Sequence, residues 1–183
     1  MSNRDHSIRL EPSVLEDRRR FYDWLVHPEL VPFLLGPPLF PDADIPTWEE
    51  FSADYLDYFF TGSNPELGRC YRILMDEVCI GQINYASGLP SHLVAELDIW
   101  MSSPEFCGHG YGVEAIQILS GILLNDLGKE ELVIRPSARN PRAVRAYEKA
   151  GFRRIEIDRE AAAVSYGNGD YYDDVVLVLR KNP

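Results

Sequence analysis

The sequence predicts an α+β fold with one mixed central sheet and helices on both of its faces. Three segments with strand-type alternation, residues 70–75, 78–85 and 93–101, follow one another across short turns, which indicates an antiparallel meander. After residue 104 helical and strand-like segments alternate instead. The 183 residues contain no internal repeat, low-complexity tract or linker, so residues 1–183 are expected to form a single domain.

The segments before the meander predict a strand followed by two helices. Residues 7–10 alternate like a short strand, and a helical pattern opens at Pro12-Ser13 and is bounded by Pro28. A Pro-rich loop over 36–46 leads to Thr47-Trp48-Glu49-Glu50, which fits a capping box. The aromatic stripe of the helix that follows is expected to lie in the core: Trp48, Phe51, Tyr55, Tyr58 and Phe59.

The segments after the meander predict two helices and three strands. Helical periodicity runs over 112–127, with Gly128 at the position of a left-handed cap. A strand over 131–135 precedes a helix that begins at Asn140-Pro141 and ends at Ala150-Gly151. Further strands are expected near 153–157 and 171–180, and acceptor-specifying loops over 31–46, 86–92 and 158–170.

Composition excludes several classes of function. With 18 basic and 29 acidic residues the net charge is −11, which disfavours nucleic acid and anionic membrane as partners and attracts cations. No apolar run reaches the roughly 18 residues of a membrane span, and the N-terminus lacks a signal-peptide core, so a cytoplasmic location is expected. The three cysteines match neither a disulfide framework nor a zinc pattern, and no metal is expected.

The run Gly108-His109-Gly110-Tyr111-Gly112 lies between a strand and a helix. Alternating glycines let backbone N–H groups approach an anion, and the following helix directs its unpaired N–H groups and positive dipole end to the same place, so the run indicates a pyrophosphate cradle. The alternative is a tight turn with no ligand. Its late position excludes a Rossmann site, and Gly112-Val113-Glu114 lacks the Lys-Ser/Thr of a Walker loop.

The helix after Asn140 contributes a second group of candidate residues. Asn140 and Tyr147 are seven positions apart, two turns along one helical face, so a ligand beside that helix would meet an amide at one end and a phenol at the other. The alternative is an N-cap asparagine and a core tyrosine.

Together, the glycine run and Asn-x-x-Ala-x-x-x-Tyr-x-Lys-x-Gly-Phe over 140–152 resemble motifs A and B of the GNAT (GCN5-related) N-acetyltransferase superfamily. The resemblance covers about residues 93–157 and implies a GNAT fold and acetyl-CoA as co-substrate. It also implies that Tyr147 protonates the departing thiolate. The positions that it assigns to cofactor binding are Ile99, Trp100, Met101, Cys107, Gly108, His109, Gly110, Tyr111, Gly112, Asn140, Arg142 and Tyr147.

Cys107 departs from the family pattern, which usually has Gln or Arg there. We expect cofactor binding to persist, more weakly, because most phosphate contacts in such a loop come from backbone N–H groups. His109 either adds a charge-assisted contact or faces solvent. The position of Cys107 in a phosphate loop argues against a role as nucleophile.

Within the superfamily the sequence resembles aminoglycoside 6'-N-acetyltransferases, through Leu97-Asp98 ten residues before Gly108 and the segment from Pro136 to Phe152. Some of these features are shared with siderophore hydroxylysine acetylases. Ribosomal-protein-type N-terminal acetyltransferases have an element that resembles Trp24 to Glu29.

Glu96 and Asp98 are candidate bases. They are two apart in a strand, so both fall on one face just before the glycine run, where either would accept a proton from the acceptor amine. Asp98 is preferred because the aminoglycoside-enzyme resemblance puts an acidic residue at that spacing; the alternative is a solvated acidic strand face. An amide near Trp100 would bind the oxyanion.

We therefore expect an N-acetyltransferase that acts on a primary amine of a small cationic acceptor, aminoglycoside-like compounds in particular, which would link it to antibiotic resistance. The alternatives are acetylation of protein N-termini and a non-catalytic CoA-binding module. The sequence fixes neither the acceptor nor the oligomeric state.

Overall fold

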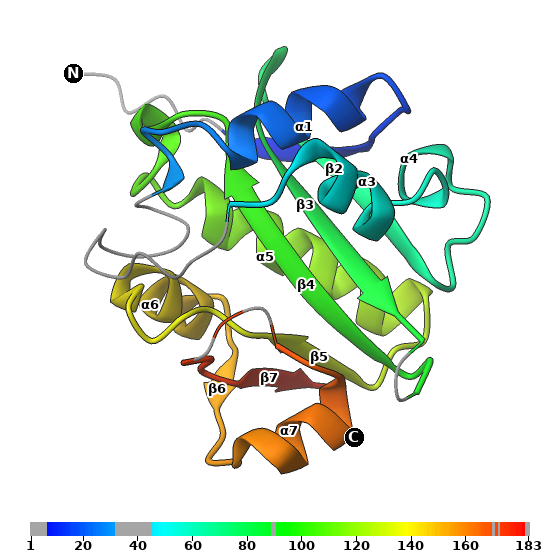
Figure 1. Ribbon diagram of the computed structural model, residues 1–183, viewed down its shortest axis with the longest axis vertical. Helices are drawn as coiled ribbons and strands as arrows, with labels where there is room; N and C mark the ends of the chain where they lie inside the picture. The colour runs from blue at the N-terminus through cyan, green and yellow to red at the C-terminus, as the bar shows by residue number, and fades with distance from the viewer. Residues whose placement is uncertain (1–6, 32–44, 89–90, 170, 172, 182–183) are drawn as a thin grey trace.

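The computed structural model describes residues 7–31, 45–88, 91–169, 171 and 173–181. Its strands form one mixed sheet in the order β1-β2-β3-β4-β5-β7-β6 (Figure 1). Only the β4–β5 pair is parallel, and the other neighbours are antiparallel. The strands are β1 (Ile8–Pro12), β2 (Gly68–Met75), β3 (Val78–Ser87), β4 (Val94–Met101), β5 (Glu131–Ile134), β6 (Arg153–Arg154) and β7 (Leu177–Arg180).

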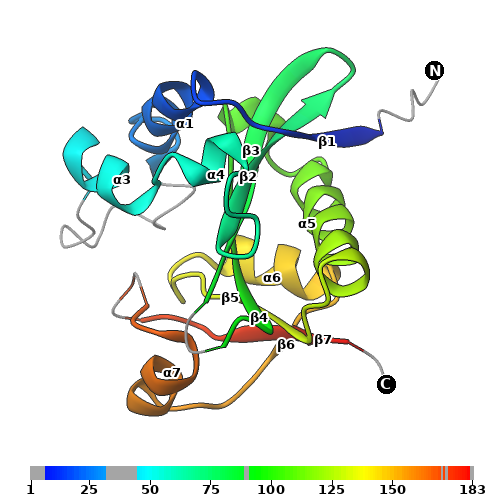
Figure 2. The ribbon, with the colours of Figure 1, turned by 90° about the vertical axis from the view of Figure 1, so that its right-hand side faces the viewer.

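Helices cover both faces of the sheet, as predicted (Figure 2). One face carries α1 (Asp17–Leu25), α3 (Trp48–Asp54), α4 (Tyr58–Thr61) and α7 (Arg159–Tyr166). The opposite face carries α5 (Tyr111–Gly121), which continues as a π-helical turn over Ile122–Asp126, and α6 (Pro141–Lys149). In the described part of the chain, no helix is both long and apolar enough to cross a membrane.

Two apolar clusters follow from this arrangement. Leu97 and Met101 of β4 pack into the main core with Ile116 and Leu119 of α5. Trp100 points to the other face, where it joins an aromatic cluster formed by residues of α1, α3, α4 and β2: Phe21, Phe51, Phe59, Phe60 and Cys70. Because strand side chains alternate between faces, Glu96 and Asp98 share the face of Trp100.

The helix expected over the aromatic stripe is interrupted. The predicted capping box is confirmed, since the Thr47 hydroxyl accepts from the Glu50 N–H at 3.2 Å and the Glu50 carboxylate accepts from the Thr47 N–H at 2.8 Å. The backbone leaves the helical region at Tyr55 and resumes in α4. The bend lets Phe51 and Phe60 both reach the cluster around Phe21 and Trp100, which a straight helix would not allow.

The loop expected over 158–170 contains a helix instead. Asp158 caps α7 by accepting from the Ala161 N–H at 2.8 Å, and Ala162 and Tyr166 pack on Val133 and Val178 of the sheet. The Asp-x-x-Ala start and the run of alanines were a local helix signal. The last strand is shorter than the expected 171–180, with an isolated bridge between Ser137 and Asp174 before it. Most of the expected loop over 31–46 lies outside the described residues.

Candidate active site

A cleft opens where β4 and β5 part. Their parallel pairing ends at Glu96 and Val133, whereas β4 continues to Met101. Within the described part of the chain, one edge of the last residues of β4 therefore faces no neighbouring strand. The cleft has a volume of about 460 Å³ and is lined by residues from both faces of the sheet. Helix α6 and the loop that precedes α5 contribute lining residues from one face of the sheet. Tyr55 and Asn84 contribute them from the other face.

The open edge of β4 presents backbone groups to this cleft. The Ser102 N–H donates to the Ile80 carbonyl of β3 at 2.8 Å. Successive N–H groups of a strand point to opposite edges, so the Trp100 N–H also faces β3. The N–H groups of Ile99 and Met101 therefore face the cleft. The Ile99 N–H donates to Asp98 Oδ1 at 2.8 Å. Trp100 itself is buried, and its indole donates to the Phe21 carbonyl at 3.1 Å. The Met101 N–H is therefore directed to the cleft, whereas the Trp100 N–H is not.

The glycine run forms the turn that starts α5. Gly108 and Gly110 have φ values of +86° and +93°, a backbone conformation that side chains with a Cβ rarely adopt. Gly110 is the N-cap and supplies no capping side chain. The first intrahelical bond comes from Glu114 to the Gly110 carbonyl, so the N–H groups of Tyr111 and Gly112 point out of the helix end. These groups and the helix dipole form a site suited to an anion.

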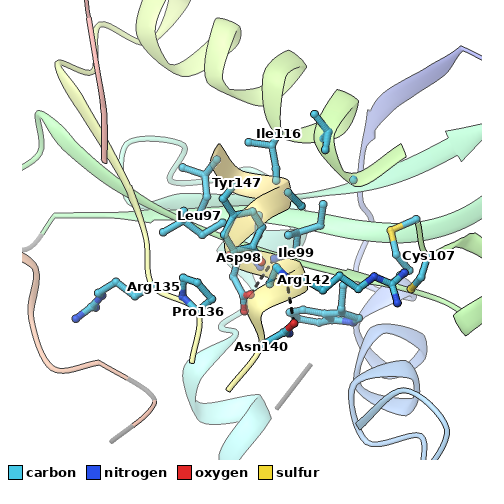
Figure 3. Close-up of a pocket in the computed structure, with 18 of the residues that line it drawn as sticks. Leu97, Asp98, Ile99, Cys107, Ile116, Arg135, Pro136, Asn140, Arg142 and Tyr147 are labelled. Atoms are coloured by element: carbon cyan, nitrogen blue, oxygen red, sulfur yellow. Dashed lines mark hydrogen bonds between the residues drawn. The ribbon is translucent and has the colours of Figure 1, made fainter. Parts of the chain in front are cut away.

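A cation lies over this loop. The guanidinium of Arg142, from α6, contacts the Cys107 thiol, and a methyl group placed on Gly108 would lie 3.2 Å from Arg142 Nη2 (Figure 3). Burial raises the pKa of the Cys107 thiol, and the charge of Arg142 offsets this only partly. The thiol is therefore protonated near neutral pH, as a residue without a nucleophilic role would be. His109 is exposed and lies 5.8 Å from the Tyr111 ring, centroid to centroid.

Helix α6 and its N-cap residue face the cleft, with Asn140 and Tyr147 among the lining residues. Asn140 Oδ1 accepts from the Ala143 N–H at 3.1 Å, so Asn140 is the N-cap and also lines the cleft. Tyr147 packs against the main core and lies beside Asp98 (Figure 3). Burial raises the pKa of the Tyr147 phenol, and the negative charge of Asp98 raises it further. The phenol therefore stays protonated throughout the physiological range.

Asp98 points to the face of the sheet that carries α1 and α3, where it meets Tyr55. Its side chain is exposed to the cleft, and Oδ2 accepts from the Tyr55 hydroxyl at 3.2 Å. Tyr55 in turn accepts from Asn84 Nδ2 at 3.3 Å. The sequence placed Tyr55 in the aromatic core, and only its hydroxyl end leaves that cluster.

Glu96 has different surroundings from Asp98. Its carboxylate forms a two-point ion pair with Arg135, at 2.7 and 2.6 Å, and only 5% of the Arg135 side chain is exposed. Arg135 also donates to the carbonyls of Tyr166, Gly167 and Asn168. Glu96 therefore neutralises a buried cation that anchors the chain after α7, which distinguishes it from Asp98 as a candidate base.

The ion pair predicts a loss of stability in Glu96→Gln. Removing the carboxylate takes a two-point ionic partner away from a buried guanidinium, and because Glu96 is partly exposed we expect a loss of about 2–3 kcal/mol in the free energy of unfolding. Urea denaturation followed by circular dichroism measures it. The matched control is Asp23→Asn, which removes an exposed i,i+4 pair with Arg19 and is expected to cost about 0.5 kcal/mol or less. Equal losses in the two variants would contradict the assignment.

Sequence patterns did not indicate Tyr55, Asn84 or Arg135 as site residues. The one sequence feature that could have indicated Asn84 is the pair Gln82 and Asn84, two positions apart in a strand. Amide side chains on one face of a buried strand are uncommon. Arg135 directly follows β5 and is part of no recognised motif. Among the described residues, no group of three or more His, Cys, Asp or Glu side chains is arranged to hold a metal ion.

The sequence and the fold match known proteins. The family described as Acetyltransferase (GNAT) domain matches residues 7–153. Among solved structures, AAC(6')-Ib in complex with ribostamycin and coenzyme A superimposes with a TM-score of 0.72 at 21% identity, covering 96% of this chain and 94% of that one. Spermidine N-acetyltransferase from Vibrio cholerae with CoA and spermine gives 0.67 at 18% identity, covering 94% and 95%.

A domain from Methanocaldococcus jannaschii gives a TM-score of 0.69 at 16% identity, covering 97% of this chain and all of the other. At these identities the structural matches establish the fold. The family match spans most of the chain, including the strand, glycine run and helix that line the cleft. The chain therefore belongs to the GNAT acetyltransferase family.

Proposed function

We propose that this protein transfers the acetyl group of acetyl-CoA to a primary amine of a small cationic acceptor, with aminoglycosides as the first candidate class. One observation carries the proposal. The β4–β5 opening joins an anion-binding helix start and Tyr147 on one face of the sheet to an exposed carboxylate, Asp98, on the other. Such a passage would let a thioester and an amine approach from opposite faces and meet beside the edge of β4.

The cofactor side is assigned to the loop and the edge strand. The N–H groups of the turn from Cys107 to Gly112 would hold the pyrophosphate, and the edge carbonyls of Ile99 and Met101 would pair with the pantetheine arm. Asn140 would contact the same arm from α6. Acetyl-CoA supplies the activated acyl group.

The acceptor side supports the chemistry of amine acetylation. Asp98 would accept the ammonium proton, the Met101 N–H would stabilise the oxyanion, and Tyr147 would return a proton to the thiolate. The neighbouring enzymes also support a polycationic acceptor, since their structures hold kanamycin, ribostamycin or spermine. The net charge of −11 favours such ligands.

A screen for CoA release tests the proposal. The purified protein is mixed with acetyl-CoA and kanamycin, ribostamycin, spermine, hydroxylysine or short peptides with free N-termini, and released thiol is measured. We expect turnover with an aminoglycoside and acetylation at one amine by mass spectrometry. Turnover on peptides alone would identify an N-terminal acetyltransferase, and cofactor binding without any turnover would identify a CoA-binding module.

The position of Arg142 predicts that its replacement lowers the affinity for CoA. Because its guanidinium lies over the loop where Cys107 replaces the usual Gln or Arg, we propose that it supplies the side-chain contact to the phosphates. Arg142→Gln should weaken CoA binding by roughly tenfold or more, the value of one charge-assisted hydrogen bond. Calorimetry at two salt concentrations measures it. The control Arg153→Gln removes an exposed cation away from the cleft, and equal affinity in both variants would refute the role.

A further inference from the structure

A chain of hydrogen bonds leads from the interior of the sheet to Asp98. Asn84 Nδ2 donates to Gln82 Oε1 at 3.4 Å and to the Tyr55 hydroxyl at 3.3 Å, and Tyr55 donates to Asp98 Oδ2 at 3.2 Å. Gln82 and Asn84 are buried, with 0% and 3% of their surface exposed. The chain therefore has a fixed inner end and one end at the cleft.

The chemistry of these groups sets the direction of each hydrogen bond. An amide nitrogen only donates, so the Tyr55 oxygen uses a lone pair toward Asn84 and its proton is left for the carboxylate. The Ile99 N–H donates to the other carboxylate oxygen at 2.8 Å. Both oxygens of Asp98 thus have a donor within the protein, and both donors favour the charged form.

The ring of Tyr55 is held in place by its neighbours. It stacks on Phe51 with centroids 4.5 Å apart and an interplanar angle of 16°, and it meets Trp100 edge-on at 5.9 Å. Phe59 contacts it from α4 at 5.4 Å. Because Phe51, Phe59 and Trp100 are buried, the phenol has little freedom to turn away from Asp98.

We propose that Tyr55, oriented by Asn84, is a positioning residue that keeps Asp98 ionised and aimed at the acceptor amine. The inference rests on the proposed function, in which Asp98 is the base. It assigns the aromatic cluster of α1, α3 and α4 a second role, as the support that fixes the geometry of the proton acceptor. Tyr55 itself neither gains nor loses a proton in the reaction.

The experiment follows the titration of Asp98 directly and needs no acceptor. Protein with ¹³C-labelled aspartate is titrated by NMR, and the Asp98 signal is identified by its absence in Asp98→Asn. In Tyr55→Phe we expect the midpoint of the Asp98 titration to move upward by roughly half a pH unit or more, because a donor to the charged form is lost. The control Tyr58→Phe removes a phenol from the same cluster and should leave the midpoint unchanged.

Other titratable groups near Asp98 are retained in both variants. They are Tyr147 on α6, Cys70 on β2, and Glu96 on β4 with its partner Arg135. An unchanged midpoint in Tyr55→Phe, with a near-UV spectrum like that of the parent, would overturn the proposal. An equal shift in Tyr58→Phe would overturn it as well, because the effect would then belong to the cluster as a whole.

Kinetics with an amine that gives turnover separates this inference from the proposed function. Tyr55→Phe should lower kcat about tenfold with little change in the KM for acetyl-CoA, and the acidic limb of the kcat profile should move to higher pH. A shifted titration with unchanged kcat would overturn the positioning role alone. Full activity in Asp98→Asn would instead overturn the assignment of Asp98 as the base.

Discussion

Asp98→Asn is expected to lower kcat/KM for the amine acceptor by about 10²–10³-fold near neutral pH, the usual contribution of a general base. The amide keeps the size of the side chain and an acceptor for the Tyr55 hydroxyl, but it takes up no proton from the ammonium group. The affinity for CoA should be unchanged, because the proposed contacts to the cofactor do not include the Asp98 carboxylate. Steady-state kinetics with the acceptor found by the CoA-release screen, together with CoA calorimetry, measure both quantities.

The control for this variant is Glu96→Gln, since Glu96 is the other carboxylate on the same face of β4. Its pairing with Arg135 leads us to expect a loss of stability with a much smaller loss of kcat, measured well below the unfolding transition. Loss of activity in Glu96→Gln with full activity in Asp98→Asn would identify Glu96, and not Asp98, as the base. The acidic limb of the wild-type pH profile should also be absent in Asp98→Asn.

Tyr147→Phe is expected to lower kcat by about 10²-fold while CoA still binds. The ring that packs on the core is retained, and only the hydroxyl that would protonate the leaving thiolate is removed. Pre-steady-state release of CoA should slow by the same factor if proton donation limits the reaction. An unchanged kcat would exclude Tyr147 as the acid and would favour protonation from solvent.

Ionisation of the Tyr147 phenol is expected to affect kcat only at high pH. Burial and the charge of Asp98 both raise the pKa of the phenol, so its neutral, proton-donating form persists to higher pH than that of a solvent-exposed tyrosine. The wild-type kcat should therefore show no loss from Tyr147 ionisation up to about pH 10, the ordinary tyrosine value. Tyr85→Phe is the matched control, because it removes another buried phenol, whose hydroxyl donates to the Pro65 carbonyl away from the cleft. It should lower stability and leave kcat unchanged.

Local sequence determined the parts of the site that depend on neighbouring residues. The capping box at Thr47, the cap at Asn140 and the left-handed glycines before α5 are each set by interactions within a few positions along the chain. The alternation of β4 placed Glu96 and Asp98 on one face in the same way. Helical periodicity did not predict the bend at Tyr55, because tertiary packing overrides it there. The helix over 159–166 departs from the loop expected over 158–170, although Asp158 and the alanines are a local helix signal.

Only the tertiary structure decided which of these groups meet. Tyr55 and Asp98 are 43 positions apart, and Glu96 and Arg135 are 39 apart, so their contacts depend on how helices dock on the sheet and on where β4 and β5 separate. Residue spacing carries no information about such pairs, because long-range contacts follow from packing of the whole core. The sequence alone thus determined the family, the glycine turn and the two candidate carboxylates. The fold decided that one carboxylate is neutralised by a buried arginine and that the other faces an open cleft.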